Sequence, residues 1–173
     1  MDGINLERKH YCPDFEKVRT VLKRIGAKKE IVKNQKDYFF ELPILQNRNS
    51  ARLKLRVENS RKILVYYERP DPAGVENTIS DVMLYDVKDN RLLPFLDKAL
   101  GIKGIVEKKR EVWRKGSTIF HLDAVRGVGN IFEIELRRKG EITDKDKAIF
   151  KSYQNELMLF LGNVIKGSNV ELI

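Results

Sequence analysis

The sequence predicts an α+β fold in which an antiparallel sheet closes into a small β-barrel, with helices packed outside it. Seven short segments alternate between polar and apolar residues, and three longer ones carry apolar residues at helical spacing. In addition, the charged residues of the predicted strands gather by sign on single faces. With 173 residues, 42% of them hydrophobic and 34% charged, the chain is expected to form one domain over residues 1–173.

Three segments are predicted to be helices because apolar residues recur every three or four positions along them. Asp14 can cap the first helix with its side chain, and Gly26 can end it. In the second helix Pro94 must lie in the first turn, where proline is tolerated. The third helix is expected to end before Gly162. The predicted helices cover residues 14–27, 90–100 and 143–161.

The other regular segments are short and alternate in polarity, which is typical of strands. Many strands and few helices indicate the α+β class. Residues 70–74 contain two prolines and a glycine, and they are predicted to form a hairpin loop because they are too few to separate domains. The predicted strands cover residues 4–10, 36–41, 51–58, 62–69, 105–113, 117–123 and 130–137.

The predicted strands separate charged from apolar side chains cleanly. Because successive side chains point to opposite faces of a strand, residues 51–57 place three cations on one face and four apolar residues on the other. Residues 131–136 place two glutamates together with Ile131. The charged faces carry Asn5, Glu7 and Lys9; Arg52, Lys54 and Arg56; Lys108 and Arg110; His121 and Asp123; and Glu133 and Glu135.

Two arrangements explain this pattern. A half-solvated sheet would pack its apolar face on the core and leave the charges in water, which is common. Such a surface usually mixes the two signs of charge, however, and the three amphipathic helices need an apolar surface to cover. Both points favour a closed barrel whose apolar side faces outward under the helices and whose charged faces line the lumen.

A lumen lined in this way suits a polyanion bound together with a metal ion. Lys and Arg neutralise the charges of a triphosphate, and Arg adds forked hydrogen bonds. Carboxylates need another partner, and Mg²⁺ or Mn²⁺ takes hard oxygen ligands and can bridge protein and phosphate oxygens. The candidate oxygen ligands are Glu7, Asp123, Glu133 and Glu135.

The composition leaves a second class of partner open. The net charge of +9 is also typical of nucleic-acid binding, for which Tyr66, Tyr67 and Trp113 would be stacking residues. These aromatics fit core or wall positions equally well, so nucleic acid is the less favoured partner. Cys12 is the single cysteine and is expected to pack as a small apolar residue. The sequence has no apolar run of signal-peptide or membrane-spanning length, so we expect a cytoplasmic protein without a membrane partner.

Five motifs, in chain order, resemble those of the CYTH family, which includes class IV adenylyl cyclases, thiamine triphosphatases and inorganic triphosphatases. The resemblance covers nearly the whole chain. It implies a closed eight-stranded antiparallel β-barrel with helices outside, called a triphosphate tunnel. The motifs are residues 5–9 (NLERK), 35–40 (QKDYFF), 52–56 (RLKLR), 108–110 (KKR) and 121–135 (HLDAVRGVGNIFEIE).

Asn5, residues 66–71 (YYERPD) and residues 80–81 (SD) are similar to a subgroup described as class IV adenylyl cyclase-like. This subgroup implies conversion of ATP to cyclic AMP and pyrophosphate. Hydrolysis of an inorganic, nucleoside or thiamine triphosphate is the alternative reaction, and binding of polyphosphate or nucleotide without turnover is a third expectation. The expected ligand is a small triphosphate, namely ATP, tripolyphosphate or thiamine triphosphate. A homodimer is left open.

The resemblance also implies roles for the lumenal residues. Glu7 and Lys9 are implied to be catalytic. The implied ligands of Mg²⁺ or Mn²⁺ are Glu7, Asp123, Glu133 and Glu135. The implied triphosphate-binding residues are Lys9, Arg52, Lys54, Arg56, Lys108 and Arg110.

Three positions depart from the family pattern. Asn5 offers a neutral oxygen where the signature has a glutamate, so we expect weaker metal binding. Glu68 stands where many triphosphatases of the family have a lysine, and Ile119 stands where related sequences often have an arginine. Both changes reduce the expected hydrolase activity. His121 is predicted to be a wall residue rather than a general base.

Overall fold

The structure, a computed structural model, describes residues 3–43, 51–68 and 78–173. Runs of strands are separated by a few helices, as the α+β prediction requires. In chain order they are β1 (Gly3–Tyr11), α1 (Phe15–Arg24), β2 (Lys28–Phe40), β3 (Arg52–Glu58), β4 (Arg61–Glu68), β5 (Thr78–Val87), α2 (Leu92–Leu100), β6 (Ile102–Lys115), β7 (Thr118–Val125), β8 (Gly129–Arg138), α3 (Asp144–Leu157), the 3₁₀ helix η1 (Met158–Phe160), β9 (Val164–Ile165) and the 3₁₀ helix η2 (Asn169–Leu172).

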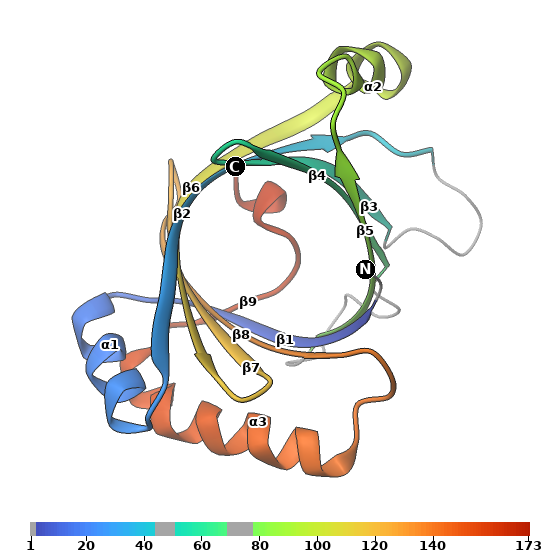
Figure 1. Ribbon diagram of the computed structural model, residues 1–173. Coiled ribbons are helices and arrows are strands. Elements are labelled where there is room, and N and C mark those ends of the chain that lie inside the picture. The colour runs from blue at the N-terminus through green and yellow to red at the C-terminus, as the bar shows by residue number, and fades with distance from the viewer. Residues whose placement is uncertain (1–2, 44–50, 69–77) are drawn as a thin grey trace.

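The sheet closes into a barrel, which confirms the predicted fold class. Within the described residues, eight antiparallel strands follow the order β5-β4-β3-β2-β6-β7-β8-β1, and β1 pairs back with β5. Figure 1 looks along the barrel and shows the strands as a ring. The short strand β9 pairs with β1 at Lys9 and His10, beyond the part of β1 that pairs with β5.

The three helices lie where the periodicity places them. The Asp14 side chain caps α1 by accepting from the backbone N–H groups of Glu16 and Lys17. Pro94 falls in the first turn of α2. Thr143 caps α3 and forms a reciprocal capping box with Asp146.

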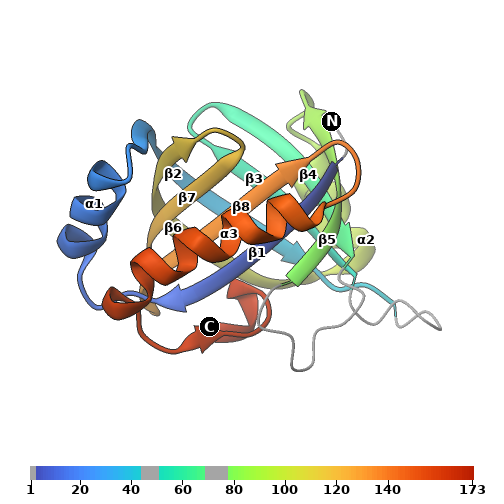
Figure 2. The same ribbon diagram turned by 90° about the horizontal axis from the view of Figure 1, so that it is seen from below.

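Helices α1 and α3 cover the apolar outer face of the barrel. Figure 2 shows α3 lying across the strands. Leu22 of α1 and Phe150 of α3 belong to one buried cluster with outward-facing residues of β7 and β8 such as Phe120 and Phe132. The half-solvated sheet is wrong, because the sheet closes on itself and its charged side chains line the enclosed interior instead of an open surface. Trp113 also lies in this cluster, so it does not stack on a nucleic acid.

The C-terminal segment closes one end of the barrel. Figure 1 shows it inside the ring of strands, and Figure 2 shows it at one end. Val170 of η2 packs with Phe39, Val106 and Ile131 in a second apolar cluster. A Cβ atom at Gly104 would come within 2.7 Å of Val170 Cγ2, so glycine permits this close approach. We call the segment from β9 to η2 the plug.

Some elements differ from the prediction. β5 was not predicted: its outward residues Ile79, Met83 and Tyr85 are apolar yet exposed, so the strand lacks a clean alternation. β2 begins at Lys28, well before the predicted start. The plug was not predicted either, and residues 69–77, with the expected hairpin loop, lie outside the described residues. Among the helices described, none is long and apolar enough to cross a membrane.

Candidate functional site

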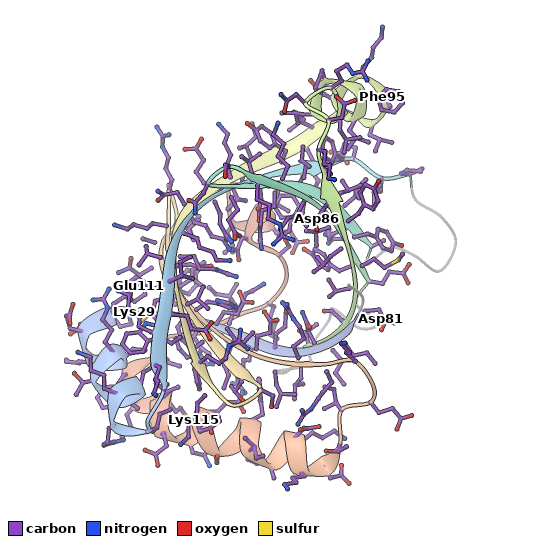
Figure 3. The ribbon with its side chains drawn as sticks, in the orientation of Figure 1. Lys29, Asp81, Asp86, Phe95, Glu111 and Lys115 are labelled. Carbon is purple, nitrogen blue, oxygen red and sulfur yellow. The ribbon has the colours of Figure 1, made fainter. Side chains whose placement is uncertain are left out.

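The barrel encloses a cavity of about 460 Å³ that is lined by all eight of its strands in the described part of the chain. The plug contributes Ser168 and Asn169 to one end. Figure 3 shows side chains projecting inward from the wall, with Asp86 of β5 on the inner side. The predicted inward faces of the strands therefore do line the lumen.

Two aspartates each hold a Lys-x-Arg pair in the lumen. Asp37 of β2 lies directly opposite Arg56 of β3. The Arg56 guanidinium donates to both Asp37 oxygens at 2.7 Å, and Lys54 Nζ donates to one of them at 2.9 Å. This carboxylate fixes two buried cations in one orientation, because the arginine contact is bidentate.

The second cation pair is built in the same way on the neighbouring strands. Asp123 of β7 lies opposite Arg110 of β6. Arg110 donates to both Asp123 oxygens at 2.6 Å, and Lys108 Nζ donates at 2.9 Å. Asp123 is fully buried, with both oxygens turned toward these cations. Its role as a metal ligand stays a prediction.

Beside the second pair, His121, Glu133 and Glu135 form the acidic cluster of the lumen. Their candidate ligand atoms all lie within 4.8 Å of one another, so this cluster could hold a metal ion. His121 Nε2 lies 3.3 Å from Glu135 Oε2, and Arg110 donates to Glu133 at 3.1 Å. In the β1–β8 register Glu7 lies opposite Glu135. The predicted carboxylates thus meet at one place, apart from Asp123.

Burial and neighbouring charges set the ionisation of this cluster. Burial raises the pKa of the Glu133 carboxyl, but the charges of Lys9 and Arg110 outweigh it and hold that pKa well below its usual range. Burial also raises the pKa of Glu135, but the hydrogen-bonding contact with His121 outweighs this effect, so the pKa of Glu135 is lowered. Burial and the charge of Arg110 lower the pKa of His121. At neutral pH the cluster holds two carboxylates and a neutral imidazole.

The two lysines of the cation pairs have lowered pKa values. Burial, together with the charge of Arg56, lowers the pKa of Lys54 to about 7, although Asp37 partly offsets the shift. Burial and the charge of Arg110 lower the pKa of Lys108 in the same direction. Burial in the lumen therefore favours loss of a proton from these lysines, and a bound anion would reverse that preference.

Several lumenal polar atoms are buried without a hydrogen-bond partner among the described residues. They include Asn5 Oδ1, Ser80 Oγ, His121 Nδ1 and Asn169 Oδ1. Each of these four residues is at most 7% exposed. Buried polar groups normally have partners, so these atoms indicate that the lumen holds a polar ligand, an ion or water. Oxygen and imidazole nitrogen donors also suit a divalent metal, so the residues present fit such an ion.

The remaining predicted site residues lie at the margins of these groups. Lys9 Nζ is 3.6 Å from Glu7 Oε1, next to the acidic cluster. Arg52 lies at the plugged end, where it pairs with Glu171 of η2. Ile119, which departs from the family pattern, lines the cavity, and Glu68 ends β4.

Sequence reasoning missed part of the site. Asp37 was given no role of its own, and His121 was expected to be a wall residue rather than a general base. Tyr67 lines the cavity, and its hydroxyl lies 3.1 Å from Ser168 Oγ of the plug. Only cross-strand register brings these residues to the site. For His121, the sequence did offer one signal, because alternation along the strand places it on the same inward face as Asp123.

One wall of the cavity is apolar. Ile63 and Val65 of β4 and Val82 and Leu84 of β5 line it side by side, with Val65 directly opposite Leu84. We call these four residues the aliphatic wall. A site for phosphate alone has no need of such a surface.

Comparisons with known proteins agree with this geometry. An adenylate cyclase candidate from Methanocaldococcus jannaschii is 27% identical over 174 residues, which cover 98% of each chain. A solved Pyrococcus horikoshii protein has a TM-score of 0.79 at 22% identity, covering 98% of this chain and 99% of that one. A Hippeastrum adenylyl cyclase candidate, described as having a dominant triphosphatase activity, has a TM-score of 0.61 at 15% identity, covering 95% and 91%. The CYTH domain matches residues 3–166, and the chain therefore belongs to the CYTH family.

Proposed function

We propose that this protein binds a nucleoside triphosphate with a divalent metal ion in the barrel and acts on it, with cyclisation of ATP to cyclic AMP and pyrophosphate as the first candidate reaction. The observation that carries the proposal is the convergence of two Lys-x-Arg pairs and an acidic cluster on one enclosed cavity. Cations for phosphate and carboxylates for a metal are the two halves of a triphosphate site.

The cation pairs would bind and orient the phosphates. Arg56 and Arg110 are held rigidly by Asp37 and Asp123, so they reach the ligand without first losing side-chain freedom. Lys9 lies beside Glu7, where its charge would stabilise the leaving phosphate. These groups position the reacting phosphorus and neutralise the charge that develops there.

Glu7, Glu133 and Glu135 would hold the metal ion. A divalent ion held by these residues would supply electrostatic stabilisation of the charge that develops at the reacting phosphorus. In the cyclase reaction the ribose hydroxyl attacks the α-phosphorus and pyrophosphate leaves. In hydrolysis water attacks the terminal phosphorus and orthophosphate leaves. The same residues serve both reactions, because the two differ in where the triphosphate sits along the tunnel.

The aliphatic wall supports an organic triphosphate over inorganic tripolyphosphate. Val82 and Leu84 are partly exposed to the cavity. Covering apolar area stabilises a complex by about 25 cal/mol per Å², and only a ligand with an apolar or planar group can cover it. A nucleoside or thiamine group offers such a surface.

A triphosphatase is the second candidate, because the Hippeastrum relative is described as having a dominant triphosphatase activity. Binding without turnover is the third, and three positions favour it. Asn5 replaces a metal-binding carboxylate of the family signature, Glu68 replaces a lysine, and Ile119 places an apolar side chain in the lumen.

Incubation with ATP or tripolyphosphate plus Mn²⁺ or Mg²⁺, followed by phosphorus NMR, tests the proposal. Cyclic AMP with pyrophosphate identifies a cyclase, and orthophosphate identifies a hydrolase. Glu133→Gln is the matched control, since it keeps the size of a group at the centre of the acidic cluster and removes its charge. Equal turnover in this variant would refute the metal role. If there is no turnover but both ligands still raise the midpoint of thermal unfolding, the protein is a binding module without catalytic activity on these ligands.

A further inference from the structure

We propose that His121 is itself a ligand of the metal ion in the tunnel, and that its ring nitrogen makes the site select Mn²⁺ and Co²⁺ over Mg²⁺. The inference rests on the proposed function in one respect, namely that an ion binds at the acidic cluster. It adds a ligand that the carboxylate set lacks, and it assigns a preference among metals.

The separation of His121 and Glu135 fits two ligands of one ion. Ligand distances of about 2.0–2.2 Å place two neighbouring ligand atoms about 3.0 Å apart in octahedral geometry and about 3.5 Å apart in tetrahedral geometry. His121 Nε2 and Glu135 Oε2 are 3.3 Å apart, between these two values. For an N–H to oxygen hydrogen bond the same distance is long, since such bonds cluster at about 2.9–3.0 Å.

The His121 ring is not satisfied by the protein alone. The residue lines the cavity and is only 6% exposed, and its Nδ1 has no hydrogen-bond partner among the described residues. The long contact with Glu135 is its one polar contact there. The ring nitrogens of a buried histidine with a purely structural role normally have hydrogen-bond partners. Among the described residues, Asn5 Oδ1, which also faces the cavity from β1, has no hydrogen-bond partner either.

Neighbouring arginines contact both carboxylates that lie beside the ring. Arg137 donates to Glu135 Oε1 at 2.6 Å, which leaves Oε2 on the side of His121. Arg110 donates to Glu133 Oε2 at 3.1 Å, and Glu133 lies directly opposite His121 in the β7–β8 register. Outer contacts of this kind fix first-sphere ligands in known metal sites. The two carboxylates and the imidazole therefore lie close enough together to bind one metal ion.

The nitrogen donor decides the metal preference. Mg²⁺ demands oxygen ligands in near-ideal octahedral geometry and dehydrates reluctantly. Imidazole suits the first-row transition metals, whose affinity for such sites rises from Mn²⁺ to Co²⁺ and beyond. A site of carboxylates alone would discriminate less between Mn²⁺ and Mg²⁺ than this mixed site does.

The chain contains only two histidines, which supplies a matched control. His10 is also buried, but its Nδ1 is 2.9 Å from the Gly162 carbonyl oxygen and its Nε2 accepts from Arg8, so its ring serves the packing of β1 against the segment that precedes β9. The experiment compares three metal-free proteins, namely wild type, His121→Gln and His10→Gln. Each is titrated with Mn²⁺, Co²⁺ and Mg²⁺ by calorimetry. Co²⁺ binding would also be followed by the contact-shifted imidazole N–H signal in proton NMR.

We expect wild type and His10→Gln to prefer Mn²⁺ and Co²⁺ over Mg²⁺. We expect His121→Gln to lose at least about tenfold in Mn²⁺ and Co²⁺ affinity, while its Mg²⁺ affinity changes much less. An unchanged ratio of Mn²⁺ to Mg²⁺ affinity in folded His121→Gln would overturn the inference. If that variant does not fold, the wild-type spectrum decides: absence of a shifted imidazole signal with Co²⁺ bound would overturn it equally.

The outcomes separate this inference from the proposed function. Binding of Mg²⁺ and tripolyphosphate without any effect of His121 overturns the inference alone. Failure of all three metal ions to bind while tripolyphosphate binds overturns both the metal role and the inference. Failure of both the triphosphate and the metal to bind overturns the proposed function as a whole.

Discussion

Triphosphate binding should draw a proton onto Lys54 near neutral pH. Burial and the charge of Arg56 lower the Lys54 pKa to about 7, against an ordinary value of 10.5. The lysine is thus mostly neutral above pH 7. A bound triphosphate places several negative charges in the lumen, which favours the charged ammonium and raises the pKa again.

The size of the effect follows from this shift. With a ligand-free pKa of about 7, Lys54 carries about 0.1 proton at pH 8, and with its ordinary pKa restored it carries nearly one, so binding takes up about 0.9 proton. By linkage, the affinity for tripolyphosphate should fall about tenfold per pH unit between pH 7 and the pKa of the complex. Lys108, whose pKa is also lowered by burial, adds to the uptake.

Calorimetry of tripolyphosphate binding at pH 8, in two buffers of different ionisation enthalpy, measures the uptake directly. Lys54→Arg is the matched variant, because arginine keeps the positive charge and does not titrate in this range. It should take up nearly one proton fewer than wild type, with a flatter dependence of affinity on pH. Equal uptake by wild type and Lys54→Arg would refute the reasoning, since the lysine would then be charged before the ligand arrives.

Three further predictions concern stability. The pKa values of Lys54 and Lys108 are lower in the folded than in the unfolded chain, so the unfolded state binds more protons above about pH 7. The free energy of unfolding, measured in urea, should therefore rise from pH 7 to pH 9. A flat or falling free energy of unfolding over this range would contradict the prediction. Asp123→Asn leaves two buried cations without their carboxylate and should lower the free energy of unfolding in urea by about 3–5 kcal/mol. Asp86→Asn breaks an exposed ion pair and should change it little. Equal losses in the two variants would refute the stabilising role of Asp123. Gly104→Ala places a Cβ atom 2.7 Å from the plug and should lower the thermal midpoint, and an unchanged midpoint would show that the plug packs more loosely than described.

Local pattern was enough to predict the faces of most strands and the helix ends. Alternation along residues 51–57 assigns Lys54 and Arg56 to one face whatever the strand pairs with, because the period of two is a property of the single strand. Asp14 likewise caps α1 through its own neighbours. Closure into a barrel was inferred from the sorting of charge by sign, and the pairing of β5 with β1 confirms it.

The same reasoning could not find elements whose stability comes from distant contacts. β5 carries apolar residues on both faces, and its position is decided by hydrogen bonds to β4 and β1. The plug ends in the short 3₁₀ helix η2, whose Val170 is buried because it packs into the end of the barrel. The roles of the metal-binding and phosphate-binding residues stay predictions.

The sequence by itself determined that charges of both signs lie on one side of the sheet and apolar residues on the other, since side-chain direction along a strand is a local property. It also carried the resemblance to the CYTH family. Only the tertiary structure decided which groups share a contact: that Asp37 and Asp123 each hold a lysine and an arginine, and that His121 faces Glu135. These contacts depend on the register between strands far apart in the chain, and a shift of one residue would turn every one of these side chains to the opposite face.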